Sequence, residues 1–292
     1  MITNDAPGAA FGLARGQGSW RDHSALPGFR GAFAFTLFYI GLIILLPLAA
    51  LAARPWEHGL GGAVAAVMRP RTLAALRLSF LAAIAAASVN VVMGLIIAWV
   101  LGRYDFPCRR IVDALVDLPF ALPTAVAGIA LATLYGPHGW IGAIIEPLGL
   151  KVAYTPTGVF VALLAVGLPF VVRAVQPVLE YLEASLEEAS LTLGASRLQT
   201  FVRVVLPALT PSLLTGFALA FARGAGEYGS VIFIAGNMPG RSEIAPLVIV
   251  TRLEGYDYAG AAAVGLAMLA VSLLVLLAIN GVQVLLSRRG AR

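Results

Sequence analysis

Lysine is almost absent from this chain. Lys151 is the single lysine among 292 residues, and no Gly-Lys dipeptide occurs. A nucleotide-binding P-loop requires that dipeptide, because its lysine contacts the phosphates of the bound nucleotide. The sequence therefore excludes a P-loop, and we expect any ATP hydrolysis that this chain uses to occur on another polypeptide.

Cysteine and histidine are also rare, and neither forms a catalytic or metal-binding pattern. Cys108 is the only cysteine, so no disulfide can form within the chain. His23, His58 and His138 lie in three separate polar segments, without the spacing of metal ligands or of a base beside a nucleophile. We therefore expect no catalytic residue, no metal site and no cofactor, and the chain is not expected to be an enzyme.

Charged residues account for only 12% of the chain, whereas hydrophobic residues account for 60% and the mean hydropathy is +0.89. Six segments contain no Asp, Glu, Lys or Arg over about the 17 to 25 residues that a membrane-spanning helix needs. Backbone amides inside a bilayer find no water, so each segment must form its own helical hydrogen bonds. The sequence predicts an all-α polytopic membrane protein of about six transmembrane helices in contact with membrane lipid, with apolar windows at 31–53, 78–102, 118–145, 152–172, 204–222 and 258–287.

The third apolar window is too long for a single span. It contains the sequence Gly-Pro-His-Gly at 136–139, and such a cluster ends helices. We expect the helix to end near Tyr135 and the segment 140–145 to form an interfacial or re-entrant piece.

Basic residues predict which way the chain crosses the membrane. Twelve lie in segments that are cytoplasmic if both termini are inside, and seven lie in the external loops. Positive residues favour the cytoplasmic side, so we expect both termini inside a bacterial inner membrane. The pI is near 9.7, but the basic residues are scattered at helix ends, which does not favour nucleic-acid binding. The expected order is a cytoplasmic tail at 1–30, a first transmembrane helix at 31–56, a membrane core at 72–286 and a basic cytoplasmic tail at 287–292.

The segment 178–207, between the fourth and fifth windows, is acidic and amphipathic. A continuous helix places five apolar side chains on one stripe, and four glutamates occur within nine residues. Gly194 suits the left-handed turn after a helix end, so we expect a short helix, a turn and a second short helix through about Val204. Helices that lie on a membrane surface are usually basic, so the acidic composition favours docking into a basic protein groove. The apolar stripe consists of Leu179, Leu182, Leu186, Ala189 and Leu193, and the glutamates are Glu180, Glu183, Glu187 and Glu188.

A specific motif lies inside this acidic segment. Glu188-Ala189-Ser190 is followed after three residues by Gly194 and after nine more by Val-Val-Leu-Pro at 204–207. This pattern resembles the EAA loop of bacterial ABC importer permeases, from which it differs at Ser190 and Val204. The resemblance implies the transmembrane domain of a type-1 ABC importer, in which this loop is a cytoplasmic coupling helix that inserts into a cleft of the ATPase subunit. It assigns ATPase coupling to Glu187, Glu188, Ala189, Gly194, Leu206 and Pro207.

Two further stretches, 117–128 and 226–239, resemble the sulfate/thiosulfate permease subfamily called CysT or CysU, and the similarity extends over about 37–289. It implies a heterodimer with a CysW-like permease, two copies of a CysA-like ATPase that bind ATP and magnesium, and a periplasmic sulfate/thiosulfate-binding protein. A molybdate or tungstate ABC permease is the alternative within the family. An ion-coupled secondary transporter and a membrane-embedded enzyme are less favoured, because the sequence lacks paired intramembrane carboxylates and a catalytic cluster.

Charged residues near the membrane windows suggest ion pairs. Arg223 and Glu227 are four residues apart, so a helix through the fifth window places them on one face. Two interpretations stay open: Arg223 assists a passing anion, or the two residues form a structural ion pair. Asp113 and Asp117 are expected to pair with arginine near Arg109 and Arg110.

The sequence 224–229 matches the letters of the dinucleotide-binding motif G-x-G-x-x-G, but no strand precedes it. A break in the helix, or close contact between helices, is the better interpretation of these small residues.

Overall fold

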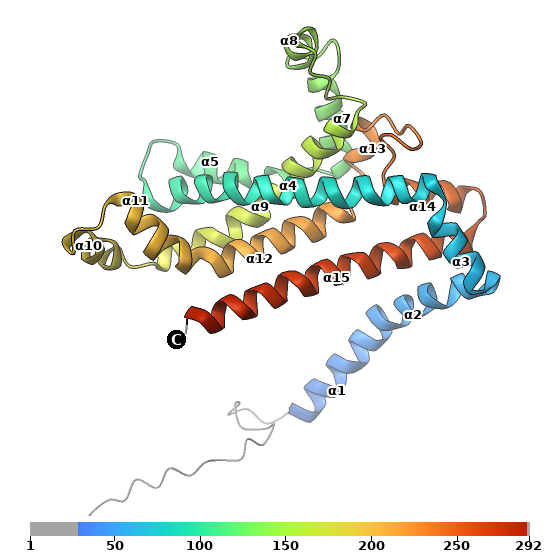
Figure 1. Ribbon diagram of the computed structural model, residues 1–292, viewed down its shortest axis with the longest axis horizontal. Coiled ribbons are helices and arrows are strands. Elements are labelled where there is room, and N and C mark those ends of the chain that lie inside the picture. The colour runs from blue at the N-terminus through green and yellow to red at the C-terminus, as the bar shows by residue number, and fades with distance from the viewer. Residues whose placement is uncertain (1–28, 291–292) are drawn as a thin grey trace, which may run out of the picture. The chain divides into compact units, whose positions relative to one another are not determined.

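The computed structural model describes residues 29–290, and within them the secondary structure is helical, with no strand (Figure 1). The chain divides into two units, Met1–Ala50 and Leu51–Arg292. The predicted tail at 1–30 lies almost wholly outside the described residues, as do the last two residues of the tail predicted at 287–292.

The first described helices form one apolar run. This run begins with α1 (Phe29–Ile40), continues through the π-helical turn η1 (Gly41–Leu45) into α2 (Leu46–Ala53), and ends in the 3-10 helix η2 (Arg54–His58). The segment Gly31–Glu57 is long and apolar enough to cross a membrane, and it covers the first predicted window. After it, the shorter apolar helix α3 (Gly59–Met68) leads into the rest of the chain.

Four further helical segments are long and apolar enough to span a membrane, which makes five in the part of the chain that the structure describes. They are α4 (Pro70–Arg103), α9 (Pro156–Tyr181), the run Arg197–Ala225 and most of α15 (Tyr258–Gly290). The run Arg197–Ala225 is made of α11 (Arg197–Thr200), the π-helical turn η4 (Phe201–Val205) and α12 (Leu206–Ala225). These segments confirm the all-α membrane fold.

The third predicted window does not form one long helix. Its residues are divided among α6 (Leu118–Ala121), α7 (Thr124–Tyr135) and α8 (Gly142–Ile145), and α5 (Arg109–Val116) precedes them. The break falls at Leu122, whose backbone is extended because the following Pro123 disfavours the helical conformation there. The predicted helix end at Tyr135 is confirmed. After α8, the chain passes through η3 (Glu146–Leu148) to α9.

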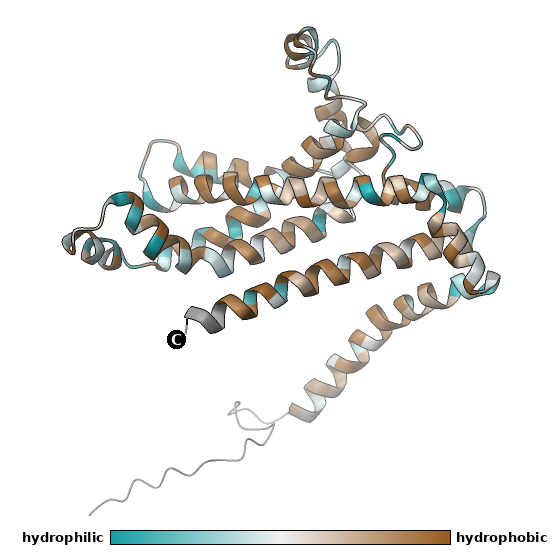
Figure 2. Cartoon of the chain, viewed as in Figure 1, coloured by the Kyte–Doolittle hydropathy of each residue, from teal (hydrophilic) through white to brown (hydrophobic). Residues whose placement is uncertain are grey.

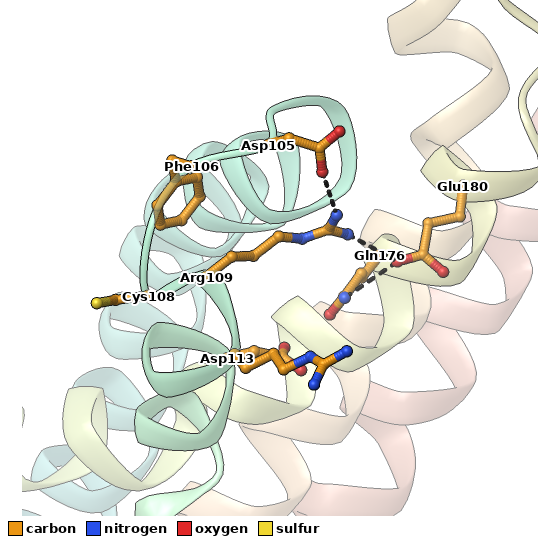
Figure 3. A pocket seen from close by; sticks show the side chains of 8 residues that line it. Asp105, Phe106, Cys108, Arg109, Asp113, Gln176 and Glu180 are labelled. Carbon is orange, nitrogen blue, oxygen red and sulfur yellow. Dashed lines mark hydrogen bonds and ion pairs between the residues drawn. The ribbon is translucent and has the colours of Figure 1, made fainter.

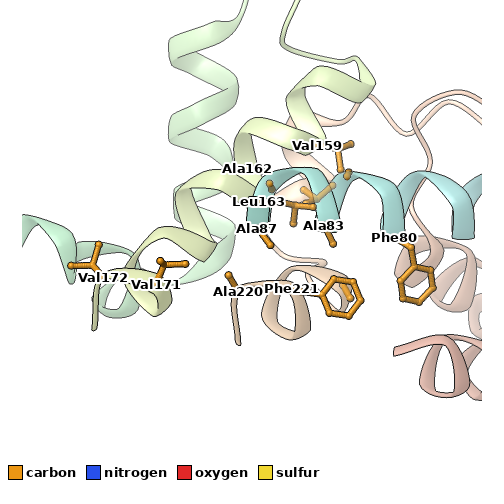
Figure 4. Packing of buried hydrophobic residues seen from close by; sticks show 14 of the residues in the cluster. Phe80, Ala83, Ala87, Val159, Ala162, Leu163, Val171, Val172, Ala220 and Phe221 are labelled. Carbon is orange, nitrogen blue, oxygen red and sulfur yellow. The ribbon is translucent and has the colours of Figure 1, made fainter. Parts of the chain in front are cut away.

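Three helices, α4, α9 and α12, form the centre of the larger unit, and small residues let them approach closely (Figure 4). A Cβ atom added at Gly94 would lie 2.7 Å from Val171 Cγ1, and one added at Gly216 would lie 2.9 Å from Val171 Cα. Asn90 Nδ2 also donates a hydrogen bond of 3.1 Å to the carbonyl oxygen of Leu164. Small side chains promote such close packing between membrane helices. The three helices therefore form a tight core, whose buried members include Phe80, Ala83, Ala87, Val159, Ala162, Leu163, Ala220 and Phe221.

Polar residues collect at the two ends of this unit, whereas the long helices between them are mostly apolar (Figure 2). One end carries α10 (Ala184–Thr192) with α11, and we call it the α10 end. The other end carries the segment after α12, with α13 (Val231–Ile234) and α14 (Ala245–Glu254), and we call it the α14 end. Many large apolar side chains on the long helices are exposed, as expected for surfaces that contact lipid or a partner subunit.

Ion pairs hold the α14 end together. Arg71 near the start of α4 binds both carboxylate oxygens of Glu243, at 2.7 and 2.6 Å. Arg252 in α14 binds Asp257 at 2.8 Å and also the Ala66 carbonyl oxygen of α3 at 3.0 Å. Burial by itself raises the pKa of Asp257, but hydrogen bonds from the Gly260 amide and from Arg252 outweigh it and lower that pKa below its ordinary value. These contacts tie α14 and the start of α15 to α3 and α4.

Candidate coupling site and anion pathway

The acidic segment folds as two helices separated by turns. The helix α9 ends at Tyr181, Leu182 and Glu183 are extended, and α10 then runs over Ala184–Thr192. The prediction that Leu179 to Leu193 share one apolar face of a continuous helix is wrong, because the helix is interrupted at Leu182 and Glu183, between α9 and α10. Gly194 has a φ of +87°, which confirms the predicted left-handed turn.

The helix after the Gly194 turn begins at α11, but it continues to Ala225, so the prediction of a second short helix through about Val204 is wrong. At its start, the hydroxyl of Ser196 accepts a hydrogen bond from the Gln199 amide, and the Gln199 side chain accepts one from the Ser196 amide. This reciprocal pair satisfies two backbone donors at the helix start and fixes where α11 begins.

Two neighbouring glutamates of α10 have different environments. Glu188 is exposed, whereas Glu187 is half-buried and binds Arg103 at 2.6 Å. Ala189, Gly194 and Pro207 are also exposed, and Leu206 is half-buried at the start of α12. The structure thus leaves Glu188 free to meet a partner and uses Glu187 within the chain.

Arg103, the last residue of α4, was missed as a candidate residue. Its Nη2 atom donates to Glu187 Oε1 and, at 3.1 Å, to the Leu182 carbonyl oxygen, and its guanidinium lies 5.8 Å from the centre of the Trp99 ring. Glu187 lies 84 positions further along the chain, so no local sequence pattern reveals the pair.

A second cluster of charged side chains is centred on Arg173 of α9. Arg173 binds Asp113 at 2.6 Å and Asp117 at 2.5 Å, so it connects α9 to the end of α5 and the start of α6. The prediction that both aspartates pair with arginine is correct, but the expected partners Arg109 and Arg110 are wrong. Arg109 binds Asp105 at 3.0 Å instead.

An open pocket of about 600 Å³ lies at the α10 end, between the α4–α5 connection and the end of α9 (Figure 3). Arg109 extends across it from Asp105 toward Glu180, whose carboxylate lies 3.9 Å away. Cys108 is exposed at its edge with a φ of +67°. The lining contains both signs of charge, so it does not form a selective anion site.

Arg223 and Glu227 form the predicted ion pair, but only Arg223 lies within the helix. The helix α12 ends at Ala225, so the prediction that both residues lie inside the fifth span is wrong for Glu227. The Glu227 side chain is buried at 2% exposure, and its Oε1 atom accepts hydrogen bonds of 2.9 Å from the amide and the hydroxyl of Ser230. The carboxylate therefore orders the turn after α12, while the guanidinium remains about one third exposed.

The glycine-rich sequence 224–229 marks this helix break, as predicted. A Cβ atom added at Gly224 would lie 3.6 Å from the Ala83 side chain, so the glycine also lies close to α4. Among residues 29–290, no group of His, Cys, Asp and Glu has the arrangement of a metal site.

Comparisons with known proteins define the class. The family model described as binding-protein-dependent transport system inner membrane component matches residues 90–292, and the chain belongs to this family. Over 248 residues, the chain is 50% identical to the sulfate transport system permease protein CysT of Synechocystis sp., covering 85% of this chain and 87% of that protein. It is 46% identical over 264 residues to the protein of the same name from Escherichia coli K12, covering 90% of this chain and 95% of that protein.

The fold is also similar to a solved structure. A chain in the crystal structure of a bacterial alginate ABC transporter, in complex with an alginate pentasaccharide-bound periplasmic protein, superposes with a TM-score of 0.71. The match covers 87% of this chain and 92% of that chain at 17% sequence identity. The similarity confirms the ABC-importer permease fold and says nothing about the substrate.

Proposed function

We propose that this chain is the membrane subunit of an ATP-driven importer that moves sulfate, and also thiosulfate, across the bacterial inner membrane. The observation that supports sulfate as the substrate is the identity of 46 to 50% with proteins named sulfate transport system permease, over most of both chains. A molybdate or tungstate permease is the alternative, and none of these relatives favours it.

The proposed assembly has four kinds of subunit. This chain pairs with a CysW-like permease, two copies of a CysA-like ATPase bind ATP and magnesium, and a periplasmic sulfate/thiosulfate-binding protein delivers the anion. The absence of a P-loop in the sequence supports the assignment of hydrolysis to the separate ATPase. Both termini and α10 then face the cytoplasm, and the α14 end faces the binding protein.

The proposed mechanism couples closure of the ATPases to movement of the membrane helices. The exposed Glu188 and Ala189 of α10 enter a cleft of the ATPase, while the Gly194 turn and α11 connect α10 to α12. When the ATPases close, the two permeases change from inward-facing to outward-facing, and the anion released by the binding protein enters between them. Interruptions such as the one at Leu122 provide positions at which helices bend.

Charge reversal at Glu188 tests this function. In the assembled complex, Glu188→Lys is expected to leave membrane insertion intact and to lower ATP-dependent sulfate uptake about tenfold or more, because it places a cation where a carboxylate meets the ATPase. Uptake of labelled sulfate into proteoliposomes, with ATPase activity measured in parallel, provides the measurement.

Asp105→Lys is the matched control, because Asp105 is a 98% exposed carboxylate at the same α10 end and lies outside the segment 178–207. Undiminished uptake and ATPase stimulation in the Glu188→Lys complex would contradict the coupling assignment. The same liposomes separate the alternatives: uptake of molybdate in preference to sulfate supports the molybdate permease, and uptake without ATP supports a secondary transporter.

A further inference from the structure

The helix α10 packs mainly against α11 and η4, which begin the run Arg197–Ala225 that follows it in the chain. Its contacts with the other long helices are few. The hydroxyls of Ser190 and Thr200, 3.0 Å apart, provide a polar contact on that side. Beside them lies a pocket of about 230 Å³, lined by Trp99, Glu187, Leu191, Arg197, Thr200, Phe201 and Val205. The contact from α10 to α4 is therefore made largely through one pair of charged side chains.

That pair is Arg103 and Glu187, and its partial burial strengthens the ion pair. The two side chains are 20% and 27% exposed, so water screens the 2.6 Å ion pair less than it screens a surface pair. Arg103 also donates to the Leu182 carbonyl oxygen in the extended connection between α9 and α10. Trp99 supports the guanidinium from one turn earlier on α4. One guanidinium thus holds both the start of the acidic loop and the first turns of α10.

The helix α4 is suited to transmit movement over a long distance. With 34 residues it is about 51 Å long, since each residue adds 1.5 Å. Its close packing against α9 at Gly94, and against α12 where Gly224 approaches Ala83, resists independent bending. At its other end, Arg71 binds Glu243, and the Ser79 hydroxyl accepts a hydrogen bond of 2.9 Å from the Ala245 amide. Polar contacts at each end of α4 therefore reach α10 and the segment that begins α14.

We propose that Arg103 is a positioning residue of the transport cycle, which through Glu187 connects the coupling helix α10 to α4 and so passes its displacement to the α14 end. This inference rests on the proposed function, because it requires that an ATPase moves α10. Glu187 then acts inside the membrane subunit, and Glu188 is the glutamate that meets the ATPase.

The test compares variants of this pair in the complete complex, in proteoliposomes with the sulfate-binding protein on the side of the membrane that the α14 end faces. Arg103→Gln and Glu187→Gln are each expected to lower the sulfate moved per ATP hydrolysed about fivefold or more, a typical size for a coupling effect. The exchanged pair Arg103→Glu/Glu187→Arg is expected to recover part of that ratio. Arg109→Gln, which removes the more exposed ion pair to Asp105 nearby, is the matched control and should keep the wild-type ratio.

The outcomes separate this inference from the proposed function. If the wild-type complex shows no ATP-dependent sulfate uptake, the proposed function fails. If the wild type transports sulfate and both single variants keep its ratio of transport to hydrolysis, the inference is overturned. Loss of complex assembly in the single variants, the exchanged pair and the conservative Arg103→Lys would also overturn it, because the pair would then be only structural.

Discussion

In the ion pair between Arg223 and Glu227, the carboxylate orders the turn after α12 and the guanidinium leaves a positive charge partly exposed. Glu227 is almost fully buried and accepts two hydrogen bonds from Ser230, whereas Arg223 keeps part of its guanidinium exposed. Replacing Arg223 by Gln leaves the buried carboxylate without its cation, at a cost of about 3 kcal/mol. We expect a lower Tm for the solubilised complex and reduced sulfate uptake.

The double variant Arg223→Gln/Glu227→Gln decides between the two interpretations of this pair. It removes both charges, so we expect most of the lost Tm and uptake to return if the pair is structural. Recovery of Tm without recovery of uptake would contradict that expectation and assign Arg223 to the anion pathway.

Residues far apart in the sequence explain why part of the site could not be predicted. Glu188 and Gly194 could be proposed from the sequence because they belong to one local motif. Arg173 and its aspartates are 56 and 60 positions apart, and their pairing depends on how α9 packs against α5 and α6. Several acids and arginines lie near the same membrane boundary, so composition alone predicts that pairs form and not which residues pair.

At the scale of elements, the packing of α7 depends on Gly128. A Cβ atom added there would lie 2.3 Å from the Ser230 carbonyl oxygen, a backbone atom that no rotamer change can move. Gly128→Ala is therefore expected to destabilise the protein by about 1–3 kcal/mol or more, the usual cost of overpacking. Thermal unfolding of the solubilised protein measures this as a lower Tm.

Gly281→Ala is the control for this change, because no atom lies within 4 Å of the added Cβ and alanine favours helix α15. Equal Tm values for the wild type and the Gly128→Ala variant would show that α7 can move away from the turn after α12.

The elements that the sequence predicted correctly are those set by local chemistry. Apolar length predicted four of the long spans in the larger unit and the run Gly31–Glu57. Glycine-rich clusters predicted the end of α7 and the turn at Gly194. The break between α9 and α10 was missed because Leu182 and Glu183 are neither glycine nor proline. The third window was expected to continue to Tyr135, although Pro123 interrupts it after α6.

At the scale of the whole molecule, α4 separates two polar ends, and its length of about 51 Å exceeds the roughly 30 Å of a bilayer core. The single cysteine, Cys108, lies exposed at the edge of the pocket at the α10 end. If α10 faces the cytoplasm, a membrane-impermeant maleimide is expected to label Cys108 in inside-out vesicles and not in intact spheroplasts. In a Cys108→Ser background, Tyr256→Cys, 79% exposed at the α14 end, is expected to give the opposite result. Labelling of Cys108 in intact spheroplasts would place α10 outside the cell, where no cytoplasmic ATPase can reach it.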